Sequence, residues 1–107
     1  MANPWAGEVA VTLNGVPQVA KLTLGALAEL EAALGDGSLM ALVERFEAGR
    51  FSARDVVMVL VAGLRGGGWQ GAAEDLGRAE IGGGPMTALR VAAELLARAF
   101  TIPEAGG

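Results

Sequence analysis

The stretch VAVTLNGVPQVAKL, Val9 to Leu22, decides the fold, because it predicts a β-hairpin near the start of the chain. Up to Leu13, apolar residues alternate with smaller or polar ones, which is the period of a strand with one buried face. Asn14-Gly15 then interrupts the alternation, and this pair favours a type I′ turn, in which both central residues need a positive φ. We therefore predict strands at about 8–13 and 16–22.

The residues after the hairpin indicate short helices that end at glycines. Thr23 is placed to cap a helix over 24–34, whose leucines follow a helical period. Ser38 is placed to cap a second helix, which Gly49 ends. The apolar positions expected to face the core are Leu24, Leu27, Leu30 and Leu34 in the first helix and Leu39, Leu42, Val43 and Phe46 in the second.

The last third of the chain predicts one short and one long helix. The short one spans about 71–79 and is interrupted by Gly77. The long one starts at Pro85, a residue suited to a first helical turn, and ends before Pro103. Its expected apolar face is Met86, Leu89, Ala92, Ala93, Leu96 and Phe100, with Thr87, Arg90, Glu94 and Arg98 opposite.

The segment 55–64 is ambiguous between a helix and a buried strand, because it is rich in valine. A near-complete capping box, Ser52 to Asp55, and the length of the segment favour a helix. As a helix it would be apolar on two faces, one formed by Val57, Leu60, Val61 and Leu64 and the other by Met58, Val59 and Ala62. Either this helix is central in the fold, or its outer face meets a partner.

The predicted strands precede all the predicted helices in the chain, and this order predicts an α+β fold. It would consist of an N-terminal β-hairpin followed by four or five short α-helices. We expect a single domain over 1–107, with loose tails at about 1–6 and 103–107. The glycine stretches 66–68 and 82–84 are too short for domain linkers, and we interpret the glycines of 63–68 as a hinge.

Composition excludes several classes of function. The chain has 8 Lys+Arg against 12 Asp+Glu and no basic cluster, so we expect no nucleic-acid binding. It has no His and no Cys, which removes zinc sites, disulfides and the commonest nucleophile and general-base schemes. Its longest apolar run, 56–62, is too short to cross a membrane. We expect a cytoplasmic protein with no membrane contact.

No motif indicates catalysis, a metal or a cofactor. The glycines of 63–68 lack the Lys-Ser/Thr that a phosphate-binding loop requires. Calcium-binding loops need alternating acidic ligands, which are missing after Gly49. The adjacent carboxylates, Glu29/Glu31, Glu44/Glu47 and Glu74/Asp75, are typical of solvated helix faces. We therefore predict a non-enzymatic protein with no catalytic residue, no metal and no cofactor.

The sequence offers a few residues that could bind a partner protein. At 52%, its hydrophobic content exceeds that of an average soluble domain, which hints at an interface. The candidate contact residues are Met58, Val59, Ala62, Trp69 and Trp5. The alternative to partner binding is that Met58, Val59 and Ala62 are buried inside the fold and that each tryptophan folds back onto the core. The hairpin edges, which only Pro17 and Lys21 protect, could also accept a strand or form a homo-oligomer.

Taken together, these segments resemble a known family. The pattern is Asn14-Gly15, then LTLGALAELEAALGDGSL (22–39), FSARDVVMVLVAGLRGGG (51–68) and LLARAF (95–100). This order is similar to that of the gene transfer agent family proteins, which are grouped with phage tail-assembly chaperones and are typical of alphaproteobacteria. The resemblance covers nearly the whole chain, and the family has no active-site residues to carry over.

The resemblance implies a role in building a siphophage-like tail. A tail-assembly chaperone would bind the tape-measure protein, or other tail proteins, and keep its hydrophobic helices soluble until the tube polymerises. The family is also labelled as tail tube protein, so a structural tube or connector component incorporated in a phage-like particle is the alternative.

Overall fold

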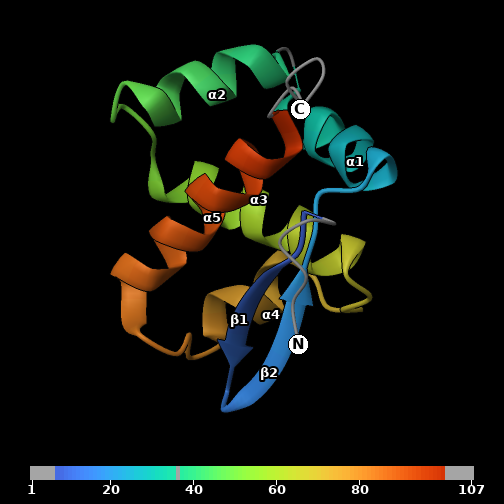
Figure 1. The fold of residues 1–107 in the computed structure, drawn as a ribbon, viewed down its shortest axis with the longest axis vertical. Coiled ribbons are helices and arrows are strands. Elements are labelled where there is room, and N and C mark those ends of the chain that lie inside the picture. Colours follow the sequence, from blue (N-terminus) through green and yellow to red (C-terminus); the bar gives the residue numbers. More distant parts are fainter. Residues whose placement is uncertain (1–6, 36, 101–107) are drawn as a thin grey trace, which may run out of the picture.

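The computed structural model describes residues 7–35 and 37–100, and it places a hairpin below a group of helices (Figure 1). β1 (Val9–Leu13) and β2 (Val16–Ala20) pair antiparallel. The turn residues between them have positive φ, 51° at Asn14 and 80° at Gly15, as a type I′ turn requires. The predicted hairpin is therefore confirmed.

Within the described residues, five helices follow the hairpin, which confirms the α+β fold. They are α1 (Leu24–Leu34), α2 (Leu39–Glu47), α3 (Ala53–Gly66), α4 (Ala73–Arg78) and α5 (Gly84–Phe100). The hydroxyls of Thr23, Ser38 and Ser52 accept hydrogen bonds from the third residue after each of them, at 3.0 to 3.1 Å. The predicted caps thus start the first three helices.

The ambiguous segment is a helix, α3, and it is the central element. It packs against α1, α4, α5 and β2, so apolar side chains are buried on several of its sides. Val59 and Leu64 have no exposed surface, and Leu60 is 1% exposed. Each such side chain contributes about 1.5–3 kcal/mol of burial free energy. The absence of a polar face follows from this central position.

The predicted second strand is two residues too long. After Ala20 the chain leaves the strand ladder, and the Lys21 N–H donates to the Gly63 carbonyl of α3 at 2.8 Å. Leu22 is nevertheless buried. The bond to α3 therefore fixes the place where the hairpin turns toward α1.

The interpretation of 63–68 as a hinge is wrong, because helix α3 continues through Gly66. Gly66 is the last residue of α3 and Gly67 is its C-cap. A Cβ on Gly66 would overlap the carbonyl oxygen of Lys21, and one on Gly67 would overlap that of Val19. These glycines are packed against the strand backbone, which only a residue without a side chain permits.

The outer edge of β1 is partly covered by the segment that precedes α5. Ile81 bridges Leu13, and the Gly82 N–H donates to the Thr12 carbonyl at 2.9 Å. Asn14 joins the same segment, since its N–H donates to the Glu80 carbonyl and its Oδ1 accepts from the Glu80 N–H, both at 2.8 Å. The hairpin edge is therefore shorter than the sequence alone indicates.

We expect Asn14→Gly to lower the free energy of unfolding by about 1 kcal/mol, because the turn keeps its φ but loses the acceptor for the Glu80 N–H. Asn14→Asp keeps an acceptor and tolerates the left-handed conformation, so it serves as the control. Urea denaturation measures both. Equal stability of the Gly and Asp variants would contradict a role for this hydrogen bond.

Two helix faces differ from the prediction at their first turns. Met86 is 75% exposed and Leu24 is 85% exposed, although both were expected to face the core. Ala93, in the middle of α5, is also exposed, because it faces the groove between α2 and α5. The buried stripe of α5 is instead Ala88, Val91, Ala92, Leu95 and Leu96. At the end of a helix, the next element covers only one side, so periodicity does not decide burial there.

Candidate interaction groove

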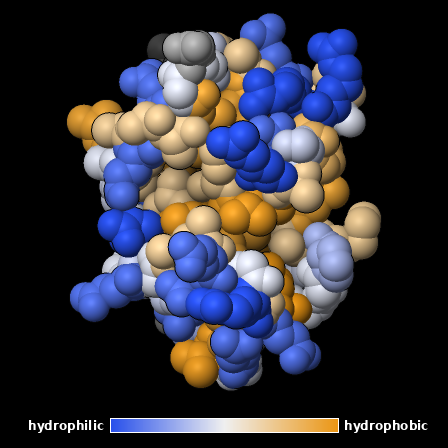
Figure 2. Space-filling view, turned by 180° about the vertical axis from the view of Figure 1, so that it is seen from behind, coloured by the Kyte–Doolittle hydropathy of each residue, from blue (hydrophilic) through white to orange (hydrophobic). Residues whose placement is uncertain are grey.

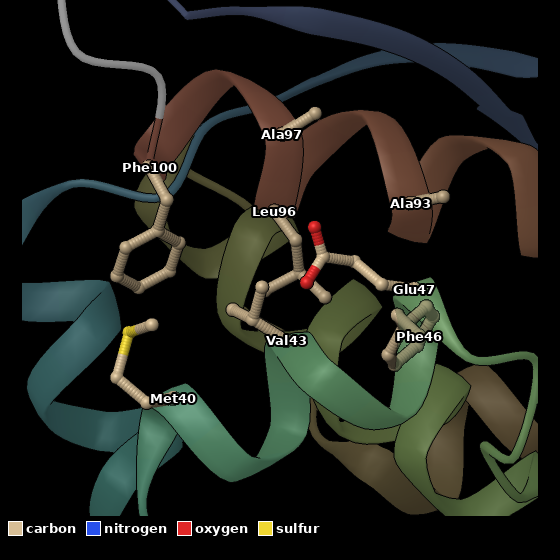
Figure 3. A pocket seen from close by; sticks show the side chains of 8 residues that line it. All are labelled: Met40, Val43, Phe46, Glu47, Ala93, Leu96, Ala97 and Phe100. Atoms are coloured by element: carbon tan, nitrogen blue, oxygen red, sulfur yellow. The ribbon is translucent and has the colours of Figure 1, made fainter.

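An apolar groove of about 510 Å³ lies between α2 and α5 (Figure 3). The two helices run antiparallel along it, with Met40 and Phe100 at one end and Phe46 and Ala93 at the other. Its lining residues are Met40, Val43, Phe46 and Glu47 from α2 and Ala93, Leu96, Ala97 and Phe100 from α5. Met40 is 58% exposed, which is unusual for a side chain of this kind.

The position of α2 beside this groove is set at the turn between α2 and α3. In the last turn of α2, Arg45 Nη2 lies 2.9 Å from Asp55 Oδ1 and Arg45 Nε lies 3.1 Å from Oδ2. The ring of Phe46 stacks on that of Phe51, with centroids 5.0 Å apart. Leu42 anchors the other side of α2, because it is completely buried. A bidentate pair and a ring stack thus hold α2 to the start of α3.

Asp55 is the one described charged residue that is buried, and all its bonds serve structure. Its Oδ2 also accepts from the Ser52 N–H at 2.9 Å, which completes the capping box of α3. Hydrogen bonds from Arg45 hold the pKa of the Asp55 carboxyl below its ordinary value. Burial acts in the opposite direction and raises this pKa, whereas the hydrogen bonds with Ser52 lower it further. The same pair raises the pKa of Arg45. Both groups are therefore ionised at neutral pH and bound to each other.

Glu47 is the only carboxylate among the described residues that line the groove. Its side chain extends between the two helices, beside Val43 and Leu96 (Figure 3). No ion pair or hydrogen bond of its carboxylate is found within 7–35 and 37–100. An unpaired negative charge on an apolar surface favours a cationic group in whatever covers it.

A second, smaller hollow of about 250 Å³ lies where α1, α3 and the start of α4 meet. It is lined mainly by apolar side chains, including Ala33, Met58 and Val61. Helix α3 lies behind α5 in Figure 1, and the back of the molecule carries a band of hydrophobic side chains between charged regions (Figure 2). At the rim, Arg65 Nε lies 3.0 Å from Glu29 Oε1, so the charges beside this hollow are already paired.

The structure places the predicted contact residues in different environments. Val59 is 0% and Ala62 is 4% exposed, so burial holds for both. Met58 is half-buried and lines the smaller hollow. Trp69 is half-buried against the core, and its ring lies on Gly71, as expected of a side chain that folds back. Trp5 lies outside the described residues, as do the expected tails.

Sequence reasoning missed the α2–α5 groove, since most of its apolar lining was assigned to the core, namely Val43, Phe46, Ala93, Leu96 and Phe100. One signal was available: apolar residues on both helices spread over more than a single stripe. On α2, Met40 lies beside the stripe of Leu39, Leu42, Val43 and Phe46. On α5, Ala93 and Ala97 widen the apolar arc beyond the buried stripe. Surplus apolar positions of this kind indicate exposed hydrophobic surface.

Glu29, Arg65 and Gln70 line a further, more polar hollow, where Glu29 and Arg65 pair with each other. No group of three or more acidic residues on the described part of the chain could hold a metal ion. The adjacent carboxylates Glu29, Glu44 and Glu74 are exposed. None of the described helices combines the length and the hydropathy that crossing a membrane requires.

The fold and its surface define a class: a small α+β domain with two mainly apolar hollows between its helices. A family model described as "Phage tail tube protein, GTA-gp10" matches residues 6–101. The chain belongs to this family, and it is therefore a gene transfer agent tail protein. The family resemblance is confirmed. No match was found among curated proteins or among solved structures.

Proposed function

We propose that this protein is a non-enzymatic tail-assembly chaperone that binds the tape-measure protein in the cytoplasm during assembly of a phage-like tail. The observation that carries the proposal is the α2–α5 groove, a mainly apolar hollow whose walls include the exposed Met40 and the half-buried Val43 and Phe100. Membership of a tail protein family supports a partner among tail proteins. Met58 lines the smaller hollow and Trp69 lines the polar hollow that shares Glu29 and Arg65 with it, and together they form a secondary contact region for the same partner.

A structural tube or connector component is the second candidate, and the printed family description favours it. Against it, the described residues contain one two-stranded sheet, whereas a tube wall built from strands needs a larger one. A chaperone leaves the particle, while a structural subunit remains in it. Mass spectrometry of purified particles separates the two candidates, since a fixed stoichiometric copy number would support the second.

Co-expression with the tape-measure protein of the same gene cluster tests the chaperone. We expect the two proteins to elute together from a size-exclusion column, and the tape-measure protein to be soluble only in the presence of this chain. Separate elution, with no gain in tape-measure solubility, would rule out the proposal.

Ala93→Arg tests whether the groove is the contact surface. Ala93 is exposed and lines the groove, so an Arg there would obstruct it without disturbing the core. We expect roughly tenfold weaker tape-measure binding. The matched control is Ala32→Arg on α1, which is also exposed and lines neither hollow. Equal binding by both variants would place the contact elsewhere.

A further inference from the structure

The two walls of the α2–α5 groove share one spacing. Met40, Val43 and Glu47 follow one another at three and four residues on α2, and Ala93, Ala97 and Phe100 at four and three on α5. Each wall therefore extends over two helical turns, or about 10 Å. This length matches the apolar stripe of a third helix, whose contact residues recur at i, i+3 or i+4, and i+7.

The chemistry of the two groove walls disfavours an extended peptide or a small polar ligand as the occupant. Both are helices, whose backbone groups are already hydrogen-bonded, so an extended peptide in the groove would leave its own N–H and C=O groups unpaired. A helix satisfies its backbone internally. The alanines Ala93 and Ala97 leave room for a third helix to approach α5 closely. A small polar ligand would need several convergent polar groups, and the described lining offers only Glu47.

From this spacing and from the unpaired charge, we infer that the groove binds an amphipathic α-helix with an apolar stripe of two turns and a Lys or Arg beside that stripe, opposite Glu47. The inference rests on the proposed function, and it specifies which segments of a tail protein are bound. Glu47 contributes charge complementarity, whereas Val43, Leu96 and Phe100 supply the apolar contact.

Synthetic helical peptides test this inference with the full-length protein. One fluorescent 18-residue peptide carries Leu at i, i+3, i+4 and i+7 with a Lys beside the stripe, and a second carries Glu in place of that Lys. We expect fluorescence anisotropy to show about threefold to fivefold tighter binding of the Lys peptide, the upper part of the range of an exposed ion pair, and a smaller ratio at high salt. Equal affinity for both peptides would overturn the inference.

Charge variants locate the effect at one side chain. Glu47→Gln should abolish the preference for the Lys peptide, and Glu47→Lys should reverse it. The matched control is Glu44→Lys on the same helix, which is exposed and lies outside the groove lining, so the preference should persist. If Glu44→Lys reverses the preference as strongly as Glu47→Lys, the effect is one of net charge and the inference fails.

Two further measurements separate the other occupants and the proposed function. Light scattering detects self-association; a dimer that Ala93→Arg dissociates would show that a second copy fills the groove, which overturns the inference. Retained tape-measure binding by Glu47→Lys at wild-type strength would overturn the inference and leave the chaperone role standing. Conversely, peptide discrimination by Glu47 without any tape-measure binding would support the groove chemistry and reject the chaperone role.

Discussion

Gly67→Ala is expected to lower the free energy of unfolding by about 3 kcal/mol, at the upper end of the effects of inserting one methyl group into a packed site. The new Cβ would overlap the carbonyl oxygen of Val19 and press on Ala20, both of which belong to β2. Gly67 has φ −90° and ψ 0°, a conformation open to alanine, so the expected loss is steric rather than conformational. Thermal and urea denaturation measure it.

The matched control for Gly67→Ala is Gly77→Ala in α4. A Cβ at Gly77 meets nothing within 4 Å, so this variant should gain about 0.5–1 kcal/mol from helix propensity and from a less flexible unfolded chain. Opposite signs for the two substitutions would confirm that the end of α3 presses on the strand backbone. A neutral Gly67→Ala would show that α3 and β2 lie further apart than described.

Asp55→Asn is expected to destabilise the protein by about 2 kcal/mol at neutral pH, because it removes the charge that Arg45 binds and weakens the capping box. The lowered pKa of Asp55 in the folded state sets the pH dependence. Its stabilisation is fully present above the unfolded pKa, about 3.9, and is lost as the pH falls through the lower folded value. The difference between wild type and variant should therefore narrow below about pH 4.

Asp75→Asn is the matched control for Asp55→Asn. Asp75 also accepts from the N-cap N–H of its helix, at 2.8 Å, but its pair with Arg78 is long, 3.7 Å, and more than half of its side chain is exposed. We expect a change of about 0.5 kcal/mol or less. Unfolding curves from pH 2 to 8 would contradict the account of Asp55 if both variants behaved alike.

The same Asp55 substitution bears on binding. The Arg45 pair and the Phe46–Phe51 stack hold α2, one wall of the groove, to the start of α3. Loss of the pair should therefore weaken tape-measure binding in the proposed function, even though Asp55 lies outside the groove lining. A variant that is destabilised but binds normally would show that the stack and Leu42 suffice to position α2.

The sequence by itself determined the hairpin and the helix starts. Asn14-Gly15 and the caps Thr23, Ser38 and Ser52 act within three residues of themselves, so their consequences can be read locally. Met58, half-buried beside the smaller hollow, could also be singled out, because an apolar residue on the second face of one helix is visible in the periodicity.

Only the tertiary structure decided the remaining features. Burial of Val59 and Ala62 follows from elements that surround α3 on several sides, which no periodicity within α3 contains. In the sequence, the glycines after Leu64 suggest a flexible loop. In the fold, Gly66 and Gly67 are packed against the backbone of Val19 and Lys21. The α2–α5 groove depends on the separation of two helices about fifty residues apart in the chain. Arg45, Asp55 and Phe51 hold α2 to the start of α3 through contacts that exist only once the chain has folded.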